Sequence, residues 1–294
     1  MYDFSKKYSE LLDVFEIYLS RYAEQVLQSR PNVLGEAMKY SLLSGGKRVR
    51  PVLMLAVAEM LNVAFENVLP YALAIEMIHT YSLIHDDLPA MDDDDFRRGK
   101  PSCHKQFGEA IAILAGDALL NQAFSIVIEA ALKGEKYALA AKLLADFAGM
   151  NGMIAGQVAD MVWSQSKTEV NAENLTYIQE NKTGKLLLAP VLIPSILAEN
   201  KFYIRLEQFG KELGKLFQVT DDILDVTGEF EALGKTVGKD EDEDKFTCVK
   251  LYGLKGALLR ADDILIKCCA ILEGIDANVE FLRDLAHYVR ERNH

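Results

Sequence analysis

Helical periodicity runs through almost the whole chain and restricts its fold more than any other feature of the sequence. Apolar residues recur every three or four positions in long segments, as in residues 3–28, which have the pattern of an amphipathic helix. The alternation of apolar and polar residues that is typical of strands is hard to find, and the 294 residues include only seven prolines. The pattern predicts an all-α protein.

Further helices are predicted at residues 32–43, 52–62, 67–88, 109–133, 136–149, 150–163, 171–198, 201–227, 247–273 and 277–293. Pro89 disfavours the α conformation of Leu88 and therefore ends one of them, and Pro190 and Pro194 are expected to kink another. No linker rich in Pro, Gly or Ser divides the chain. We therefore expect one domain, residues 1–294, built as a bundle of roughly ten or more helices.

The charge balance argues against nucleic acid as a partner. The formal net charge is −12 and no basic stripe is present. An acidic protein that binds an anionic substrate needs local positive charge from Lys, Arg or a metal ion. The four cysteines include no Cys-x-x-Cys pair, which argues against a zinc-ribbon site or a disulfide framework and fits the reducing cytoplasm.

The apolar stretches do not indicate a clean membrane span. The longest, residues 51–65 and 111–128, contain Glu59 and Asp117. Residues 1–7 do not open the hydrophobic region of a signal peptide. We therefore expect a cytoplasmic protein without integral membrane association.

Residues 85–99 hold six aspartates in fifteen positions and end in two arginines and a glycine. So many carboxylates in one short segment repel each other unless cations lie among them, and hard oxygen ligands of this kind suit Mg²⁺. The adjacent arginines suit an anion such as phosphate. An isolated run of this kind is more often a solvated acidic loop, but this one directly follows an apolar helix. The combination indicates a metal-bridged phosphate ester.

The helix that precedes this acidic run has one face of special interest. Ala72, Ile75, His79, Ser82 and Asp86 recur at a spacing of three or four and so share that face, which is apolar at one end and polar at the other. We interpret it as the wall of a cavity with a carboxylate rim. Taken without Asp86, His79 would instead be a satisfied core histidine.

A second acidic motif, residues 217–225, lies far downstream. Asp221 and Asp225 are four residues apart on one helix face, Gln218 lies about one turn earlier, and no basic residue lies within the motif to pair with them. Each motif closes a long apolar helix. Facing each other across a bundle, the two motifs could hold several Mg²⁺ ions around one diphosphate.

Basic residues occur in four places. Lys47 and Arg50 follow a Gly-Gly turn that can bring backbone N–H groups and cations to a phosphate, although the spacing is not that of a Walker loop. Arg97 and Arg98 are adjacent, so their side chains are expected to point apart and to serve two different anions. The other two places, residues 181–185 and the glycine-bracketed 234–240 in a charged loop, could equally be exposed polar segments.

Several segments together resemble the short-chain trans-prenyl diphosphate synthases, most closely the bacterial members that form farnesyl diphosphate. They are GGKRVRP (45–51), IHTYSLIHDDLPAMDDDDFRRGKPSCH (78–104), ILAGDALL (113–120), GQVAD (156–160), KTGKL (182–186), FQVTDDILD (217–225) and GKTVGKD (234–240). They lie in the family's order and cover most of the chain. The chain is therefore identified as a member of this family.

The resemblance implies a helical bundle around a deep central cavity, usually a homodimer. It implies a prenyltransferase that condenses dimethylallyl and then geranyl diphosphate head-to-tail with isopentenyl diphosphate to give (E,E)-farnesyl diphosphate. Mg²⁺-assisted ionisation to an allylic cation would start each round, with three Mg²⁺ ions that Mn²⁺ can replace. The implied metal ligands are Asp86 and Asp92 with Asp87 in support, and Asp221 with Asp222 and Asp225 in support.

The same resemblance assigns the remaining site residues. The allylic diphosphate would be held by Arg97, Lys182 and Lys235, with Thr183 and Gln218 along the path of the cation. The diphosphate of isopentenyl diphosphate would be held by Gly46, Lys47, Arg50, His79 and Arg98.

Product length would be set by the residue at the cavity floor. Tyr81 occupies the family's floor position, five residues before Asp86, although Ser82 lies nearer to the face of Asp86 on an ideal helix. The resemblance gives no role to Asp93, Asp94 or Asp95.

Other functions are less consistent with the sequence. A geranylgeranyl diphosphate synthase would differ only in product length. A class I terpene cyclase usually has Ser or Thr where Asp225 stands and would leave Lys47 and Arg50 without a second diphosphate. A phosphohydrolase with a His-Asp pair needs further His ligands, and the five histidines offer no convincing set. A Ca²⁺-binding EF-hand needs a glycine at a turn position where the acidic run has none.

Overall fold

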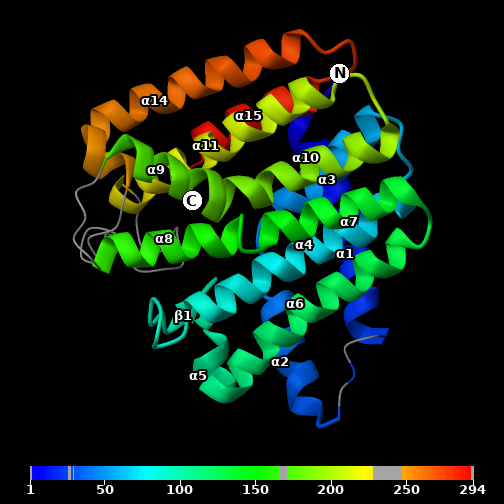
Figure 1. The fold of residues 1–294 in the computed structure, drawn as a ribbon, viewed down its shortest axis with the longest axis vertical. Helices are drawn as coiled ribbons and strands as arrows, with labels where there is room; N and C mark the ends of the chain where they lie inside the picture. The colour runs from blue at the N-terminus through cyan, green and yellow to red at the C-terminus, as the bar shows by residue number, and fades with distance from the viewer. Residues whose placement is uncertain (1, 26–27, 29, 166–170, 228–246, 293–294) are drawn as a thin grey trace.

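The computed structural model describes residues 2–25, 28, 30–165, 171–227 and 247–292 and is almost entirely helical, so the predicted all-α class is confirmed (Figure 1). The elements are α1 (Phe4–Gln25), α2 (Asn32–Leu42), α3 (Val49–Met60), α4 (Phe65–Asp86), β1 (Phe96–Arg97), β2 (Lys100–Pro101), α5 (Cys103–Phe107), α6 (Glu109–Ala131), α7 (Glu135–Ala148), α8 (Met153–Gln165), α9 (Ala172–Ile178), the π-helix η1 (Gln179–Gly184), α10 (Lys185–Ala198), α11 (Tyr203–Thr227), α14 (Cys248–Glu273) and α15 (Glu280–Glu291).

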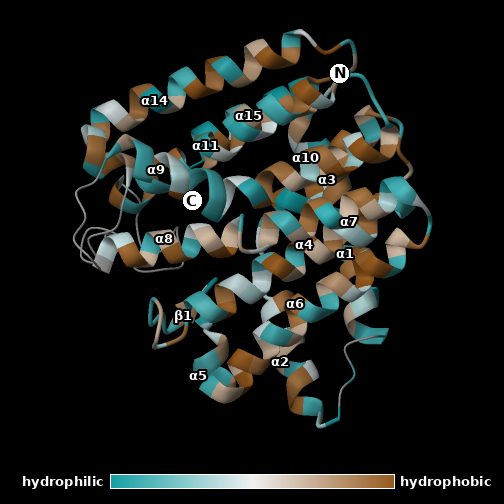
Figure 2. Cartoon of the chain, viewed as in Figure 1, coloured by the Kyte–Doolittle hydropathy of each residue, from teal (hydrophilic) through white to brown (hydrophobic). Residues whose placement is uncertain are grey.

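Helices α4 and α10 form the centre of the bundle. Helix α4 packs against α6, α3 and α10, and α10 packs in turn against α11 and α7. Nearly every residue of α10 is buried, and Phe15, Tyr71 and Phe209 are among the largest side chains that are fully enclosed. By contrast, helix α14 lies at the outside of the bundle and alternates between hydrophilic and hydrophobic residues (Figure 2), as expected for a helix with one face in solvent.

Helix α4 ends at Asp86, two residues earlier than predicted, and Pro89 follows as expected. The acidic run then leads into a short antiparallel hairpin, β1–β2, which the sequence analysis did not predict. Its two turn residues, Arg98 and Gly99, both have positive φ angles, 54° and 72°, as a type I′ turn requires. The turn sends the two adjacent arginines in different directions.

Helix α3 begins at Val49, three residues before the predicted start, because Pro51 fits the first turn of a helix, where no N–H bond is lost. The preceding residue, Arg48, is left-handed and buried. Its guanidinium donates to Glu76 of α4 at 2.6 Å, to Glu16 of α1 at 2.8 Å and to the carbonyl of Leu42 at 2.8 Å. These contacts fix the turn that carries Lys47 and Arg50.

The segment predicted as one helix, residues 171–198, is divided. Helix α10 continues through Pro190 and Pro194, and the irregular part lies instead in the π-helix η1. Two glycines of neighbouring helices explain the irregular turn. A Cβ on Gly156 of α8 would lie 2.1 Å from the backbone N of Lys182, and one on Gly214 of α11 would lie 3.0 Å from Cα of Gly184. The close crossing of α8, η1 and α11 requires small residues and a widened turn.

Two stretches are long and apolar enough to cross a membrane by length and composition. One is α6, with only a third of its most apolar window buried, and the other spans residues 135–164. The second is interrupted between α7 and α8, and α6 packs along α4 and α7. The exposed apolar face of α6 therefore lies on the side of a helix that belongs to the bundle.

The buried ion pair of Arg48 and Glu76 yields a stability prediction. Glu76→Ala leaves the enclosed guanidinium without its buried counter-charge, and we expect the free energy of unfolding to fall by about 3 kcal/mol. Glu16→Ala is the matched control, because Glu16 is 37% exposed and its removal should cost less than about 1 kcal/mol. Chemical denaturation measures both values, and equal losses would contradict the assignment.

Candidate active site

An apolar cavity of 540 Å³ opens beside the C-terminal end of α4. Its lining brings together seven residues that the sequence analysis had singled out, namely Arg50, His79, Tyr81, Ser82, Asp86, Lys182 and Thr183. Its walls are otherwise mostly apolar, with Leu120, Met153, Met161 and Leu186 among them. The cavity has a charged rim and an interior suited to a hydrocarbon chain.

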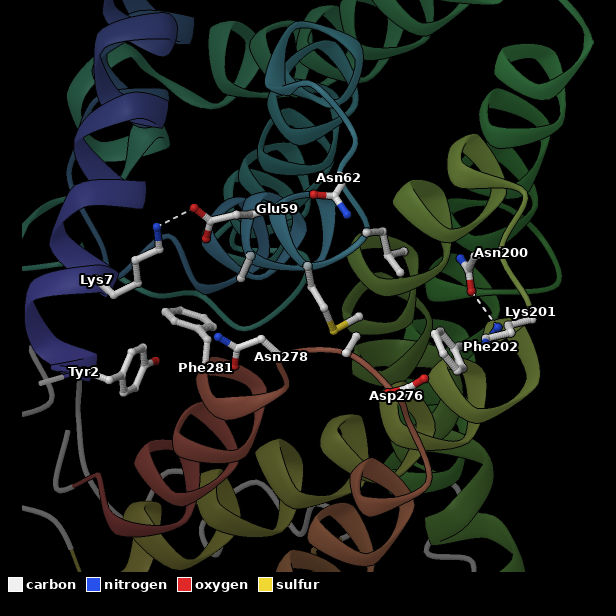
Figure 3. Close-up of a pocket in the computed structure, with 14 residues that line it drawn as sticks. Tyr2, Lys7, Glu59, Asn62, Asn200, Lys201, Phe202, Asp276, Asn278 and Phe281 are labelled. Atoms are coloured by element: carbon white, nitrogen blue, oxygen red, sulfur yellow. Dashed lines mark hydrogen bonds and ion pairs between the residues drawn. The ribbon is translucent and has the colours of Figure 1, made fainter.

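A second cavity of 840 Å³ lies between the start of α1, the end of α3 and the loops before α11 and α15 (Figure 3). Its polar groups largely satisfy one another: Lys7 pairs with Glu59 at 2.6 Å, and the side chain of Asn200 accepts the N–H of Phe202 at 2.7 Å. None of the predicted site residues lines it. We therefore place the candidate active site in the smaller cavity.

Asp86 stands at the rim of this cavity. Burial, together with the neighbouring carboxylate of Asp92, raises its pKa to about 6 even though Lys182 acts in the opposite direction. The side-chain amide of Gln157 on α8 donates to Asp86 at 2.8 Å. The backbone N–H of Asp92 donates to the carbonyl of Asp86 at 2.8 Å, so the loop returns Asp92 to the end of α4. A buried carboxylate beside other carboxylates favours the binding of a cation.

Asp87 is almost fully buried and has a different partner. Two guanidinium nitrogens of Arg97 donate to it, Nε at 2.9 Å, and Arg97 also contacts Asp94 at 3.0 Å. Burial opposes the charge of Arg97, but pairing with Asp87 and Asp94 raises its pKa. In this structure Arg97 therefore neutralises the acidic run from within.

A chain of side-chain contacts links the first acidic motif to the second. Gln157, which contacts Asp86, shares α8 with Asp160, and Asp160 pairs with Lys182 of η1 at 2.5 Å. The next residue in η1, Thr183, donates its hydroxyl to Gln218 of α11 at 2.7 Å. The two motifs are thus connected through α8 and η1.

Within the second motif, Asp222 is nearly buried and accepts the amide of Gln218 at 2.9 Å and the backbone N–H of Cys248 at 2.6 Å. Asp222 therefore fixes the start of α14 against α11. Asp225 is also nearly buried. Asp221 is more exposed and pairs with Arg292, beyond the end of α15, at 2.6 Å.

Several cationic groups of the site lie close together, and Lys47 and Arg50 are also near Asp221 of the second motif. Burial and the nearby Arg292 lower the pKa of Lys47, and burial lowers the pKa of Arg50 to about 10 and that of Arg98 below its usual range. Nε of Arg50 is enclosed without a hydrogen-bond partner in the described part of the chain. Such a concentration of positive charge suits an anion.

Arg98 adds a further cation to this group, and His79 lies beside it. Arg98 donates to the carbonyl of Gly45 and to Ser44 at 3.3 Å, so it points away from Arg97, as the sequence analysis expected. Gly46 has a φ of 117°, which favours glycine, and a Cβ there would lie 2.8 Å from the guanidinium of Arg98. Burial and the charge of Arg50 hold the pKa of His79 well below its ordinary value, so His79 is neutral at pH 7.

The sequence analysis gave no role to three residues that contact the predicted site residues. Gln157 and Asp160 lie in the GQVAD segment, which was quoted as a resemblance but given no role. Arg292 gave no signal, because it lies in a charged helix end where basic residues are common. Lys235, assigned to the allylic diphosphate, lies outside the described residues.

The comparisons with known proteins agree with this geometry. Residues 31–278 match the family described as polyprenyl synthetase. The chain is 45% identical over 262 residues to a farnesyl diphosphate synthase of Micrococcus luteus, covering 88% of this chain and 89% of that protein. It is 44% identical to a chloroplastic geranylgeranyl pyrophosphate synthase of Capsicum annuum, covering 95% of this chain and 79% of that protein.

A solved structure is similar over nearly the whole chain. It is a geranyltransferase from Helicobacter pylori complexed with magnesium and isoprenyl diphosphate. The TM-score is 0.85 at 33% sequence identity, with 98% of this chain and 97% of that chain covered.

The raised pKa of Asp86 predicts how cation binding at the rim depends on pH. A cation competes with the proton on Asp86, so the affinity for Mg²⁺ should be full above about pH 7 and about tenfold weaker at pH 5. Isothermal titration of the protein with Mg²⁺ at the two pH values measures this. Asp146→Asn, an exposed control, should keep the dependence, and an affinity of the unaltered protein that does not change with pH would contradict the assignment.

Proposed function

We propose a specific reaction for this chain, which belongs to the polyprenyl synthetase family and is a trans-prenyl diphosphate synthase. The reaction is the head-to-tail condensation of dimethylallyl and then geranyl diphosphate with isopentenyl diphosphate to give (E,E)-farnesyl diphosphate. The observation that carries the proposal is the apolar 540 Å³ cavity directly beneath the carboxylate of Asp86. A chain anchored by its diphosphate at this rim would grow into the apolar interior.

The residues at the rim fit Mg²⁺, because the donors are carboxylate oxygens and the enclosed Asp86 needs a counter-charge. Asp86, Asp92 and Asp221 would bind it, with Asp87, Asp222 and Asp225 holding them in place through their own contacts. Bound there, the metal would neutralise the allylic diphosphate as its C–O bond breaks. We propose three ions, which Mn²⁺ can replace.

Side chains of the protein position the allylic diphosphate and the cation that forms from it. Arg97, Lys182 and Lys235 hold the allylic diphosphate. The oxygens of Thr183 and Gln218, already joined at 2.7 Å, present dipoles rather than nucleophiles to the allylic cation. The walls of the cavity exclude the water that would otherwise capture the cation.

The second diphosphate fits the group of cations around Lys47 and Arg50. Lys47, Arg50 and Arg98 hold the diphosphate of isopentenyl diphosphate with the backbone of Gly46, and the neutral imidazole of His79 donates a hydrogen bond. Arg292, within reach of the same group, adds a further cation once it leaves Asp221. The departed diphosphate is the base for the final proton.

Product length is the part on which the relatives' names differ, because they include both farnesyl and geranylgeranyl synthases. We assign the C15 product to Tyr81, which is 6% exposed, lines the cavity and stacks edge-on against His85. Ser82 lines the same cavity and is the first alternative floor residue.

We also propose a cytoplasmic homodimer. Helix α6 leaves apolar side chains in solvent, among them Ile113, Leu114 and Ile128, none of which lines the 540 Å³ cavity. A second copy of the chain would bury this face. Light scattering should give the mass of two chains, and the mass of one would contradict the dimer.

Incubation with isopentenyl and dimethylallyl diphosphates and Mg²⁺, followed by chain-length analysis, tests the reaction. We expect a C15 diphosphate, with turnover lowered at least about a thousandfold in Asp86→Ala and in Asp221→Ala while helicity is unchanged. Products of C20 or longer would keep the family and refute the farnesyl assignment. A cyclic hydrocarbon would refute the reaction itself.

Tyr81→Ala tests the floor of the cavity. Removal of the ring should let the chain extend past this position, so the main product should lengthen to C20 or beyond while turnover stays within about tenfold. Ser82→Ala is the matched control on the next residue of α4. An unchanged C15 product in Tyr81→Ala, with a longer one in Ser82→Ala, would move the floor to Ser82.

A further inference from the structure

The hairpin region contains a group of side chains that the prenyl transfer reaction does not use. Asp93, Asp95 and His104 place one ligand atom each within 4.8 Å of one another. Asp93 and Asp95 lie in the acidic run, and His104 lies in α5, on the far side of the β1–β2 hairpin. Asp92 and Asp94, which alternate with them, have other contacts: the backbone N–H of Asp92 donates to the carbonyl of Asp86, and the carboxylate of Asp94 pairs with Arg97.

His104 supplies the observation that points to a ligand. It is only 5% exposed, and its Nε2 is enclosed without a hydrogen-bond partner among the described residues. Its other ring nitrogen, Nδ1, lies 3.0 Å from the hydroxyl of Ser102, which is itself buried. A donor or acceptor left unpaired in a protein interior is costly, so a ligand that pairs with Nε2 would stabilise this arrangement, and the two neighbouring carboxylates favour a cation.

The Ser102 contact also prepares the imidazole as a metal ligand. When Nδ1–H donates to the Ser102 hydroxyl, Nε2 carries the lone pair, which is the arrangement that second-shell partners impose on metal-binding histidines. Ser102 is fixed in turn, because its backbone N–H donates to the carbonyl of Asp95 at 2.8 Å. Through Ser102, the loop therefore fixes the position of His104 relative to the backbone of Asp95.

We propose that Asp93, Asp95 and His104 form a second divalent-metal site, separate from the diphosphate site, which takes a borderline metal such as Zn²⁺. One imidazole nitrogen and two carboxylate oxygens suit Zn²⁺ better than Mg²⁺, which prefers oxygen ligands and near-octahedral geometry. Bonds of about 2.0–2.2 Å require the ligand atoms to close to roughly 3.4 Å. The side chains of Asp93 and Asp95 are exposed, so rotation about their side-chain bonds can bring the carboxylates closer to the imidazole.

Lys105 is the competitor for this site. Its ammonium lies 2.7 Å from Asp95, but both side chains are about half exposed, and an exposed ion pair of this kind is weak. A dication that binds three ligands would displace it. The metal would then tie the acidic run to α5 and fix the loop that carries Asp92, Arg97 and Arg98.

Co²⁺, which replaces Zn²⁺ and absorbs visible light, tests the site in the full-length protein without diphosphate. The measurement is made in an Asp86→Asn background, which weakens cation binding at the diphosphate site. We expect one equivalent of Co²⁺ to bind with visible absorption bands, and Asp95→Asn, Asp93→Asn or His104→Gln to weaken it at least about tenfold. Asp13→Asn, an exposed aspartate on α1, is the charge-matched control and should change nothing.

Hydrogen exchange provides a second readout. Zn²⁺ should slow exchange of the amides of residues 93–104, and the effect should be lost in Asp95→Asn, whose exposed side chain leaves the fold intact. Binding that survives all three substitutions, or no binding of Co²⁺ in the Asp86→Asn background, would overturn the proposal. Because prenyl transfer is assayed with Mg²⁺ alone, its outcome is independent of this test.

Discussion

The placing of two clusters of like charge at one cavity is the constraint on which the rest of the structure depends. Carboxylates gather at the end of α4, where burial raises the pKa of Asp86 to about 6, and cations gather around the turn of Lys47, where burial lowers the pKa of Arg50 to about 10. Each of these clusters would be destabilising by itself, because it holds like charges close together and away from water. The buried pair of Arg48 and Glu76 and the contacts of Arg97 with Asp87 hold both groups in position.

The sequence predicted the fold class and part of the cavity lining, because both follow from local patterns. Of the helix face predicted as a cavity wall, His79, Ser82 and Asp86 line the cavity, whereas Ala72 and Ile75 are buried in the core. That cavity wall depends on helix geometry, which is encoded within a few residues. The divergence of the Arg97 and Arg98 side chains was also predicted, because the two residues are adjacent in the chain.

The remaining features depend on contacts between distant segments, which local patterns do not encode. The close crossing of η1 with two other helices depends on Gly156 and Gly214, which lie far from η1 in the sequence, so the π-helix was not predicted. The contact of Arg292 with Asp221 joins positions 71 residues apart, and nothing near Arg292 marks it as a site residue. The β1–β2 hairpin follows from positive φ angles at Arg98 and Gly99, of which only the glycine was a signal.

The central claim is that the two acidic motifs act on one diphosphate together, and a double-mutant cycle tests it most directly. Mg²⁺-dependent binding of inorganic diphosphate is measured by isothermal titration for the unaltered chain, Asp86→Asn, Asp221→Asn and the double variant. If the motifs share the ligand, each single substitution should weaken binding at least about a hundredfold, and the double variant should lose little more. Losses that multiply, as for independent sites, or unaltered binding in either single variant, would contradict it.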